Sequence, residues 1–161
     1  MMRSIQLFTL LLISLFTVQV AVAQKKQPKN QVSTVKKFKQ PKLKTFLEGY
    51  SDSVSVTVTE AEKIIASPLK VIDAKNNAYT LTYYQFMYTR KVVTEDEKTG
   101  KALPAVSKVA DHFTSSPLPD IWVNTIRQQV KAGEELHFFD VIVKDTQGRS
   151  MYASELKITI R

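Results

Sequence analysis

The feature that most constrains the fold is a run of strand-forming residues at positions 79–93. Aromatic side chains recur through this run, at Tyr79, Tyr83, Tyr84, Phe86 and Tyr88, with β-branched residues between and after them. Such residues favour the half-buried surface of a β-sheet. Because fifteen residues exceed the usual length of a strand, we expect a bulge or bend inside the run.

Strand patterns continue on both sides of this run. Valine alternates with serine and threonine between positions 53 and 59, as a strand with one buried face requires. Pro104, near the start of another strand pattern, favours a sheet edge. Two alternating strands end the chain, joined by a turn from Asp145 to Gly148 that suits type I geometry. The predicted strands are residues 53–59, 69–73, 79–93 and 102–113, followed by the two at the C-terminal end.

One substantial helix is predicted after Ser116, which we expect to be its N-cap, with Pro117 at the first helical position. Its apolar residues recur at spacings of three and four and predict one buried face, and Gly133 closes its end. These apolar residues are Leu118, Ile121, Trp122, Ile126 and Val130. A shorter helix is expected at residues 60–66, capped by Thr59 and Glu62.

These elements predict a mainly β (α+β) fold for residues 45–161. About six short strands, mostly antiparallel, favour an Ig-like β-sandwich with the main helix between the fourth and fifth strands. No internal repeat is visible.

The N-terminal end has the pattern of an export signal. A basic start at Arg3 precedes an apolar run, and Ala21-Val22-Ala23 offers the small residues that a signal peptidase reads, so we expect residues 1–23 to be cleaved. Retention as a membrane anchor is the alternative. Residues 24–44 contain eight lysines, two prolines and few apolar side chains, which predicts a flexible linker.

The positive charge of the chain resides in that linker. From Thr45 onward 14 basic side chains face 15 acidic ones, although the whole chain has a formal charge of +8. The lysines from Lys25 to Lys44 therefore predict either a weak contact with anionic surfaces or a solvated spacer. Nucleic acid is not expected as a partner.

No residue pattern indicates catalysis, a metal site or a cofactor. Cysteine is absent, and the two histidines, His112 and His137, lack the companions of a metal site. Asp111 beside His112 could orient a base, but no nucleophile stands at a readable spacing. The acidic residues 95–97 lack the spacing of a calcium loop. We therefore expect a protein that is not an enzyme.

Seven residues are candidate contact residues for a partner. Tyrosine is enriched in interface cores, so the aromatic run could form an interaction stripe. The other interpretation is a strand packed on both faces. The candidates are Tyr79, Tyr83, Tyr84 and Tyr88 in the run, and Arg149, Tyr152 and Lys157 near the C-terminal end.

The C-terminal third resembles a known family. Gly133 after a helix, the strand Glu135-Leu136-His137-Phe138-Phe139-Asp140-Val141, the turn at Gly148 and the final Leu156-Lys157-Ile158-Thr159-Ile160 are similar to the last periplasmic domain of GldM-type proteins. Those proteins belong to the gliding motility and type IX secretion machinery. The resemblance implies a β-rich domain that docks other envelope proteins and has no catalytic residue.

Two functions follow from these observations. The first is an exported, non-catalytic adaptor in the periplasm or cell envelope that binds other envelope proteins. The alternative is a module that binds a small ligand or glycan, with tyrosines stacked on sugar rings. Saturable changes in tryptophan and tyrosine fluorescence on adding cell-wall fragments would favour the second.

The export signal predicts that the mature protein begins at Gln24. Small residues at positions 21 and 23 direct cleavage after Ala23. Intact-mass spectrometry of the protein from its native host measures the N-terminus directly, and an intact Met1 would contradict the prediction.

Overall fold

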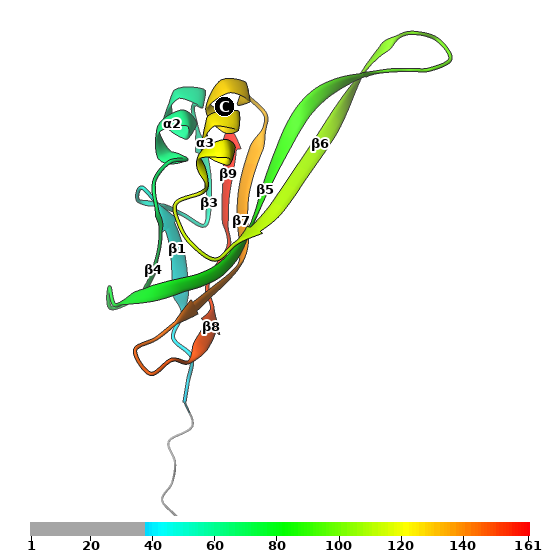
Figure 1. Cartoon of the computed structure of the whole chain (residues 1–161). Helices are drawn as coiled ribbons and strands as arrows, with labels where there is room; N and C mark the ends of the chain where they lie inside the picture. The colour runs from blue at the N-terminus through cyan, green and yellow to red at the C-terminus, as the bar shows by residue number, and fades with distance from the viewer. Residues whose placement is uncertain (1–37) are drawn as a thin grey trace, which may run out of the picture. The chain divides into compact units, whose positions relative to one another are not determined.

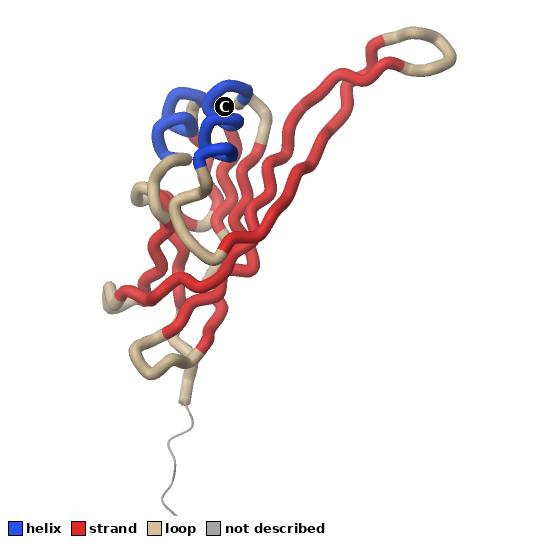
Figure 2. Tube along the Cα trace, in the orientation of Figure 1, coloured by secondary structure: helices blue, strands red, loops and turns tan. Residues whose placement is uncertain are grey.

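The computed structural model describes residues 38–161, and these residues form one mainly β unit with two short helices (Figures 1 and 2). The predicted signal at 1–23, and the linker as far as residue 37, lie outside the described residues. The strands are β1 (Leu43–Leu47), β2 (Tyr50–Ser51), β3 (Ser53–Val56), β4 (Leu69–Asp73), β5 (Ala78–Glu95), β6 (Ala102–Phe113), β7 (Glu135–Lys144), β8 (Ser150–Tyr152) and β9 (Leu156–Ile160). The helices are α2 (Val58–Ile64) and α3 (Asp120–Gln129).

The nine strands form one mixed sheet, so the expected antiparallel sandwich of about six strands is wrong. The sheet runs in the order β2-β1-β4-β5-β7-β9-β3, with β6 on β5 and β8 on β7. The only parallel pair among the described strands is β3 with β9. Asp52, which has a positive φ of 61°, stands alone between β2 and β3 and turns the chain from one end of the sheet to the other.

The sheet curls almost closed through contacts between β1 and the segment after β8. The Ser154 amide donates to the Leu43 carbonyl at 3.0 Å, and Thr45 Oγ1 donates to the Ser154 carbonyl at 2.6 Å. Thr45 is fully buried. The first strand begins at Leu43, whose side chain joins the core, although the sequence places this residue in the linker.

A single apolar core fills the inside of the curled sheet. Buried side chains alternate along β9 and in both halves of β7, whose alternation is interrupted at Phe139 and Asp140. Aromatic rings dominate the middle of this core: Phe86 lies 4.8 Å from Phe138 and 5.3 Å from Trp122 between ring centroids. The helices cover this region on one side, where Arg127 Nε donates to the Glu62 carbonyl.

Strand β5 has the irregularity that its length predicts. Its pairing with β7 shifts register twice, between Leu81 and Tyr83 and between Tyr83 and Gln85, so the expected bulge is confirmed. The expected edge strand is also confirmed, since β6 pairs with β5 alone among the described strands.

The short helix begins two residues earlier than expected. Thr57 is its N-cap and forms a reciprocal capping box with Glu60, so the predicted box of Thr59 and Glu62 is wrong. Strand β3 accordingly ends at Val56. Both threonines precede a glutamate by three residues, so the local pattern fits either pair.

The main helix begins later than expected. Ser116 is not its N-cap, because the helix starts at Asp120 and Ser116 Oγ accepts a hydrogen bond from the Leu69 amide at 2.7 Å. Ile121 is 73% exposed, so its predicted place on the buried face is wrong. Val123 and Ile126 are the buried residues within this helix, and Trp122 is partly buried against the core.

The capping box predicts a stability difference between two threonines. Thr57→Ala removes a side chain that accepts from the Glu60 amide, and we expect a loss of about 1 kcal/mol in the free energy of unfolding. Thr59→Ala removes an exposed side chain inside the helix, where alanine is the better helix former, so stability should not fall. Urea unfolding of both variants measures this, and an equal loss in both would contradict the assigned cap.

Candidate functional site

Two residues of the predicted tyrosine stripe belong to the core. Tyr84 and Tyr88 are 0% and 1% exposed, so both rings belong to the interior of the domain. The Tyr84 hydroxyl donates to the Ser115 carbonyl at 3.2 Å. The Tyr88 hydroxyl donates to Glu134, a buried carboxylate that also accepts from the backbone amides of Lys91 and Lys131. These two tyrosines therefore anchor β5 rather than form a surface.

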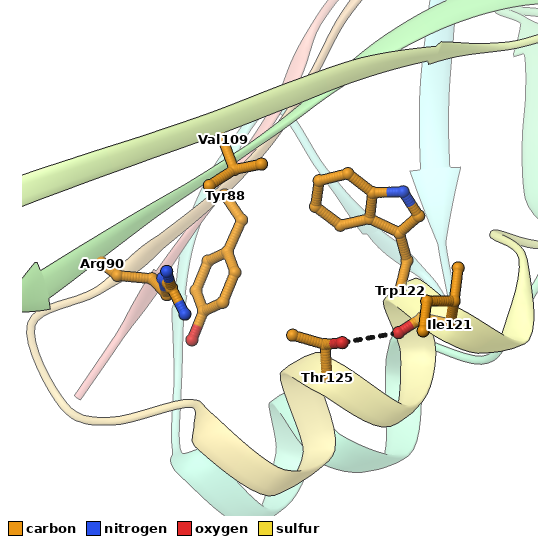
Figure 3. A pocket seen from close by; sticks show the side chains of 6 residues that line it. All are labelled: Tyr88, Arg90, Val109, Ile121, Trp122 and Thr125. Carbon is orange, nitrogen blue, oxygen red and sulfur yellow. Dashed lines mark hydrogen bonds between the residues drawn. The ribbon is translucent and has the colours of Figure 1, made fainter.

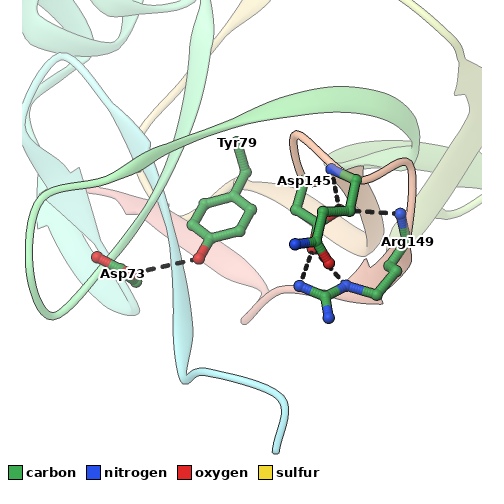
Figure 4. Close-up of polar contacts among 5 residues, drawn as sticks. Asp73, Tyr79, Asp145 and Arg149 are labelled. Carbon is green, nitrogen blue, oxygen red and sulfur yellow. Dashed lines mark hydrogen bonds and ion pairs between the residues drawn. The ribbon is translucent and has the colours of Figure 1, made fainter. Parts of the chain in front are cut away.

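The other two tyrosines of the stripe are partly buried. Tyr79 donates to Asp73 Oδ2 at 3.2 Å in the turn between β4 and β5 (Figure 4). Hydrogen bonds from Asn77 hold the pKa of Asp73 below its ordinary value. Tyr83 stacks on His112 with ring centroids 5.9 Å apart. The four tyrosines thus have different environments and do not form one stripe.

The three C-terminal candidate residues also have different contacts and do not form one cluster. Arg149 pairs with Asp145 at 2.6 Å across the β7–β8 turn (Figure 4), and its guanidinium lies 3.7 Å from the centroid of the Phe38 ring. Lys157 pairs with Glu135 at 2.8 Å. Tyr152 is 65% exposed on β8 and is the most accessible of the predicted contact residues.

The histidines occupy exposed or structural positions. His112 and Asp111 are adjacent on β6, with 3.6 Å between His112 Nδ1 and Asp111 Oδ1, and both side chains are more than half exposed. His137 Nε2 lies 3.0 Å from Glu155 Oε2 on the sheet. Within residues 38–161, no group of three or more potential metal ligands comes together.

The most prominent surface feature is a two-stranded arm formed by β5 and β6. Strand β7 pairs with β5 only as far as Thr89, whereas β6 continues the pairing to Glu95. Residues 90–95 and 102–107 therefore project beyond the sheet for about 20 Å (Figure 1).

The arm, together with Val109 at its base, carries exposed apolar side chains on both faces. The strand register places Val93 and Val106 on one face, and Leu103 and Val109 on the other. Their exposed fractions range from 41% to 72%. The outer edge of β6 has no partner strand in the described part of the chain. An exposed edge with apolar side chains is a surface suited to pairing with another chain.

A groove lies between the base of this arm and helix α3 (Figure 3). It has a volume of about 290 Å³. The helix contributes Ile121, Trp122 and Thr125, strand β5 contributes Tyr88 and Arg90, and strand β6 contributes Val109. Most of this lining is apolar, and Arg90 is its only ionised side chain.

Arg90 also lines a second hollow of about 440 Å³. Lys91 and Lys131 line this hollow too, and its carboxylate is Glu134, which is buried and accepts three hydrogen bonds. Arg90 donates to Gln129 Oε1 at 2.6 Å, but its Nε is buried without a hydrogen-bond partner in residues 38–161. Positive charge therefore gathers at the junction of the two hollows.

The sequence analysis did not identify this surface. Val106 and Val109 stand three apart, and so do not alternate as strand residues on one face would. Ile121 matched the helical spacing of the core. The available signal was the length of the two strands, which exceeds what a small sheet can cover.

No family model matches the chain, and neither does any curated protein sequence. The similarity of the C-terminal third to GldM-type domains therefore stays a prediction. In residues 38–161, neither helix is both long and apolar enough to cross a membrane.

Burial of the Tyr84 phenol predicts a loss of stability at alkaline pH. Burial raises its pKa to about 12, whereas an unfolded tyrosine titrates near pH 10. The stabilisation is therefore complete below about pH 10 and is lost as the pH rises through about 12. We expect Tyr84→Phe to lower Tm at pH 7, because a buried hydrogen bond worth about 1 kcal/mol is lost.

The same variant should make the fall of Tm between pH 10 and 12 shallower, as measured by circular dichroism. Tyr152→Phe, at an exposed phenol, is the matched control and should leave the slope unchanged. Equal slopes in the wild-type protein and Tyr84→Phe would contradict the assignment.

Proposed function

We propose that this chain is an exported, non-catalytic docking domain of the bacterial cell envelope that binds other envelope proteins through the β5–β6 arm. The observation that carries the proposal is the outer edge of β6, which pairs with no strand of residues 38–161 and is flanked by exposed Val106 and Val109. Export rests on the signal pattern at residues 1–23. A place in or beside the gliding motility and type IX secretion machinery rests on the resemblance of the C-terminal third alone.

The physical support is that the arm presents unpaired backbone groups and apolar side chains together. A sheet edge binds an extended segment through main-chain hydrogen bonds, and side chains next to the edge select its sequence. Pro104 has no amide hydrogen and Lys108 is charged, and such residues protect an edge from indiscriminate pairing. The arm is therefore suited to a selective contact.

The glycan-binding alternative has less support from the geometry. Stacking on a sugar requires an accessible ring face, but Tyr84 and Tyr88 are buried in the core. Tyr152 is exposed, yet it is a single ring on β8. We therefore favour a protein partner.

A photocrosslinking amino acid at position 106 tests the docking proposal in cells of the native host. We expect crosslinks to an envelope protein, because Val106 is 63% exposed beside the free edge. The same probe at Lys70, an exposed residue of β4, is the control and should give no such product. Mass spectrometry of the product identifies the partner.

A shortened arm provides the second half of the test. Replacing residues 92–105 by Asn-Gly joins Lys91 to Val106, which are paired in the hairpin, through a two-residue turn. The removed residues make no pairs with β7, so the domain should stay folded. Because this variant keeps Val106 and Val109, a combined variant also carries Val106→Lys and Val109→Lys, which remove the exposed apolar pair. If a pull-down with the combined variant recovers the crosslinked partner as well as the full-length chain does, the proposal is wrong.

A further inference from the structure

We propose that an extended segment of a partner protein pairs with the edge of β6 and is recognised by the groove between α3 and the base of the arm. The groove recognises an apolar side chain and a carboxylate that stand two positions apart on this segment. This inference rests on the proposed docking function and adds the chemistry of the partner. It is carried by one juxtaposition within residues 38–161: an apolar groove, a strand edge with no partner there and a guanidinium with no ion pair there meet at the same place.

The charge around the groove is positive and not neutralised within the domain. Arg90, Lys91 and Lys131 form no ion pair with any residue in the range 38–161. The nearby carboxylate of Glu134 is 2% exposed and accepts three hydrogen bonds, so it does not form an ion pair with these three cations. An incoming carboxylate would meet a net positive potential.

The guanidinium of Arg90 is held in a defined position. It lies 5.8 Å from the centroid of the Tyr88 ring, and one terminal nitrogen donates to Gln129. Its buried Nε keeps a donor without a partner in the described part of the chain. Arginine in a fixed orientation binds carboxylates better than a mobile cation does, because the donors are already aligned.

The apolar part of the groove accounts for the second element of recognition. Ile121 and Val109 stand at its mouth with 73% and 41% of their surfaces exposed, and Trp122 forms part of its wall (Figure 3). A volume of about 290 Å³ is at the lower end of the range of ligand pockets. One apolar side chain of a partner would cover Ile121 and displace water from Trp122.

The position of β6 explains why the partner should be extended. Val109 belongs to β6, so its side chain lines the groove while its backbone belongs to the free edge. A strand added at this edge points alternate side chains to the same face, about 7 Å apart. An apolar residue and an acidic residue two positions apart would therefore reach Ile121 and Arg90 respectively.

The positive charge around the groove argues against two occupants from this chain, its own lysine-rich segment and a second copy. The lysine-rich segment at 25–44 has no acidic residue and would be repelled by the three cations. A second copy paired symmetrically about Val109 would place its Asp111 opposite Ser107, the register partner of Arg90. It would also bring its own Arg90, Lys91 and Lys131 to the same contact, so that six cations would meet two exposed carboxylates. An acidic and apolar segment of a different protein fits better.

Intrinsic fluorescence tests the proposal directly, because Trp122 is the only tryptophan of the chain and lines the groove. The probes are two blocked peptides, Thr-Val-Thr-Leu-Thr-Glu-Thr and the same peptide with glutamine in place of glutamate. We expect a saturable shift of the emission to shorter wavelength with both peptides. The glutamate peptide should bind about tenfold more tightly at low salt, as a charge-assisted pair predicts.

Two variants separate the charge from the apolar contact. Arg90→Gln should abolish the tenfold preference for the glutamate peptide, and Lys98→Gln, the same change of charge in an exposed loop, should keep it. Ile121→Ala should weaken both peptides equally and leave the preference intact. Since Ile121 is 73% exposed, this variant should fold normally, and Arg90→Lys tests whether charge without the guanidinium suffices.

The outcomes divide cleanly between the two proposals. If the wild-type protein binds the two peptides with equal affinity, or if neither peptide gives a saturable signal, the proposed recognition of a carboxylate is wrong. Light scattering that shows dimers dissociated by the peptides would instead favour a second copy in the groove and also overturn it. If Arg90→Gln still gives the Val106 crosslink at full yield, docking stands and only the carboxylate is lost.

Discussion

Strand β5 is the constraint on which the rest of the structure depends. It pairs with β4 at Ala78 and Tyr79, with β7 from Thr80 to Thr89 and with β6 from Tyr84 to Glu95. Its bulge near Tyr83 allows one strand to follow the curl of the sheet and still continue outward as the arm. The core and the proposed docking surface are therefore two parts of the same strand, and a change of register in one would shift the other.

The buried carboxylate of Glu134 connects these two parts. It accepts from Tyr88 on β5, from the Lys91 amide at the start of the arm and from the Lys131 amide after α3. A buried charge is tolerated only where donors surround it, and here the donors come from three separate segments. The same contacts fix the distance between α3 and the arm, and so set the width of the groove. Burial and the hydrogen bond to Glu134 together raise the pKa of Tyr88 far above its ordinary value, so the phenol keeps its proton.

Local pattern predicted the elements better than it predicted their assembly. The strand content, the bulge in β5, the edge position of β6 and the Asp145–Gly148 turn all follow from residues close together in sequence. The parallel pairing of β3 with β9 joins residues about a hundred positions apart, and no periodicity encodes such a pair. The prediction of the N-cap was wrong because Thr57 and Thr59 have the same capping-box motif two residues apart. For the candidate surface, helical spacing identified an apolar residue at Ile121 but not whether anything covers it.

The rigid base of the arm makes an exposed surface compatible with selective binding. A flexible loop that orders on contact loses conformational entropy, and that cost reduces affinity. Here the backbone of residues 84–95 is already paired with β6, and its base is held by the buried rings of Tyr84 and Phe86. The ladder is therefore formed before any partner arrives, and a segment added to β6 would extend an existing sheet. A preformed edge beside a fixed guanidinium lets hydrogen bonding supply affinity while charge and the small apolar groove supply selectivity.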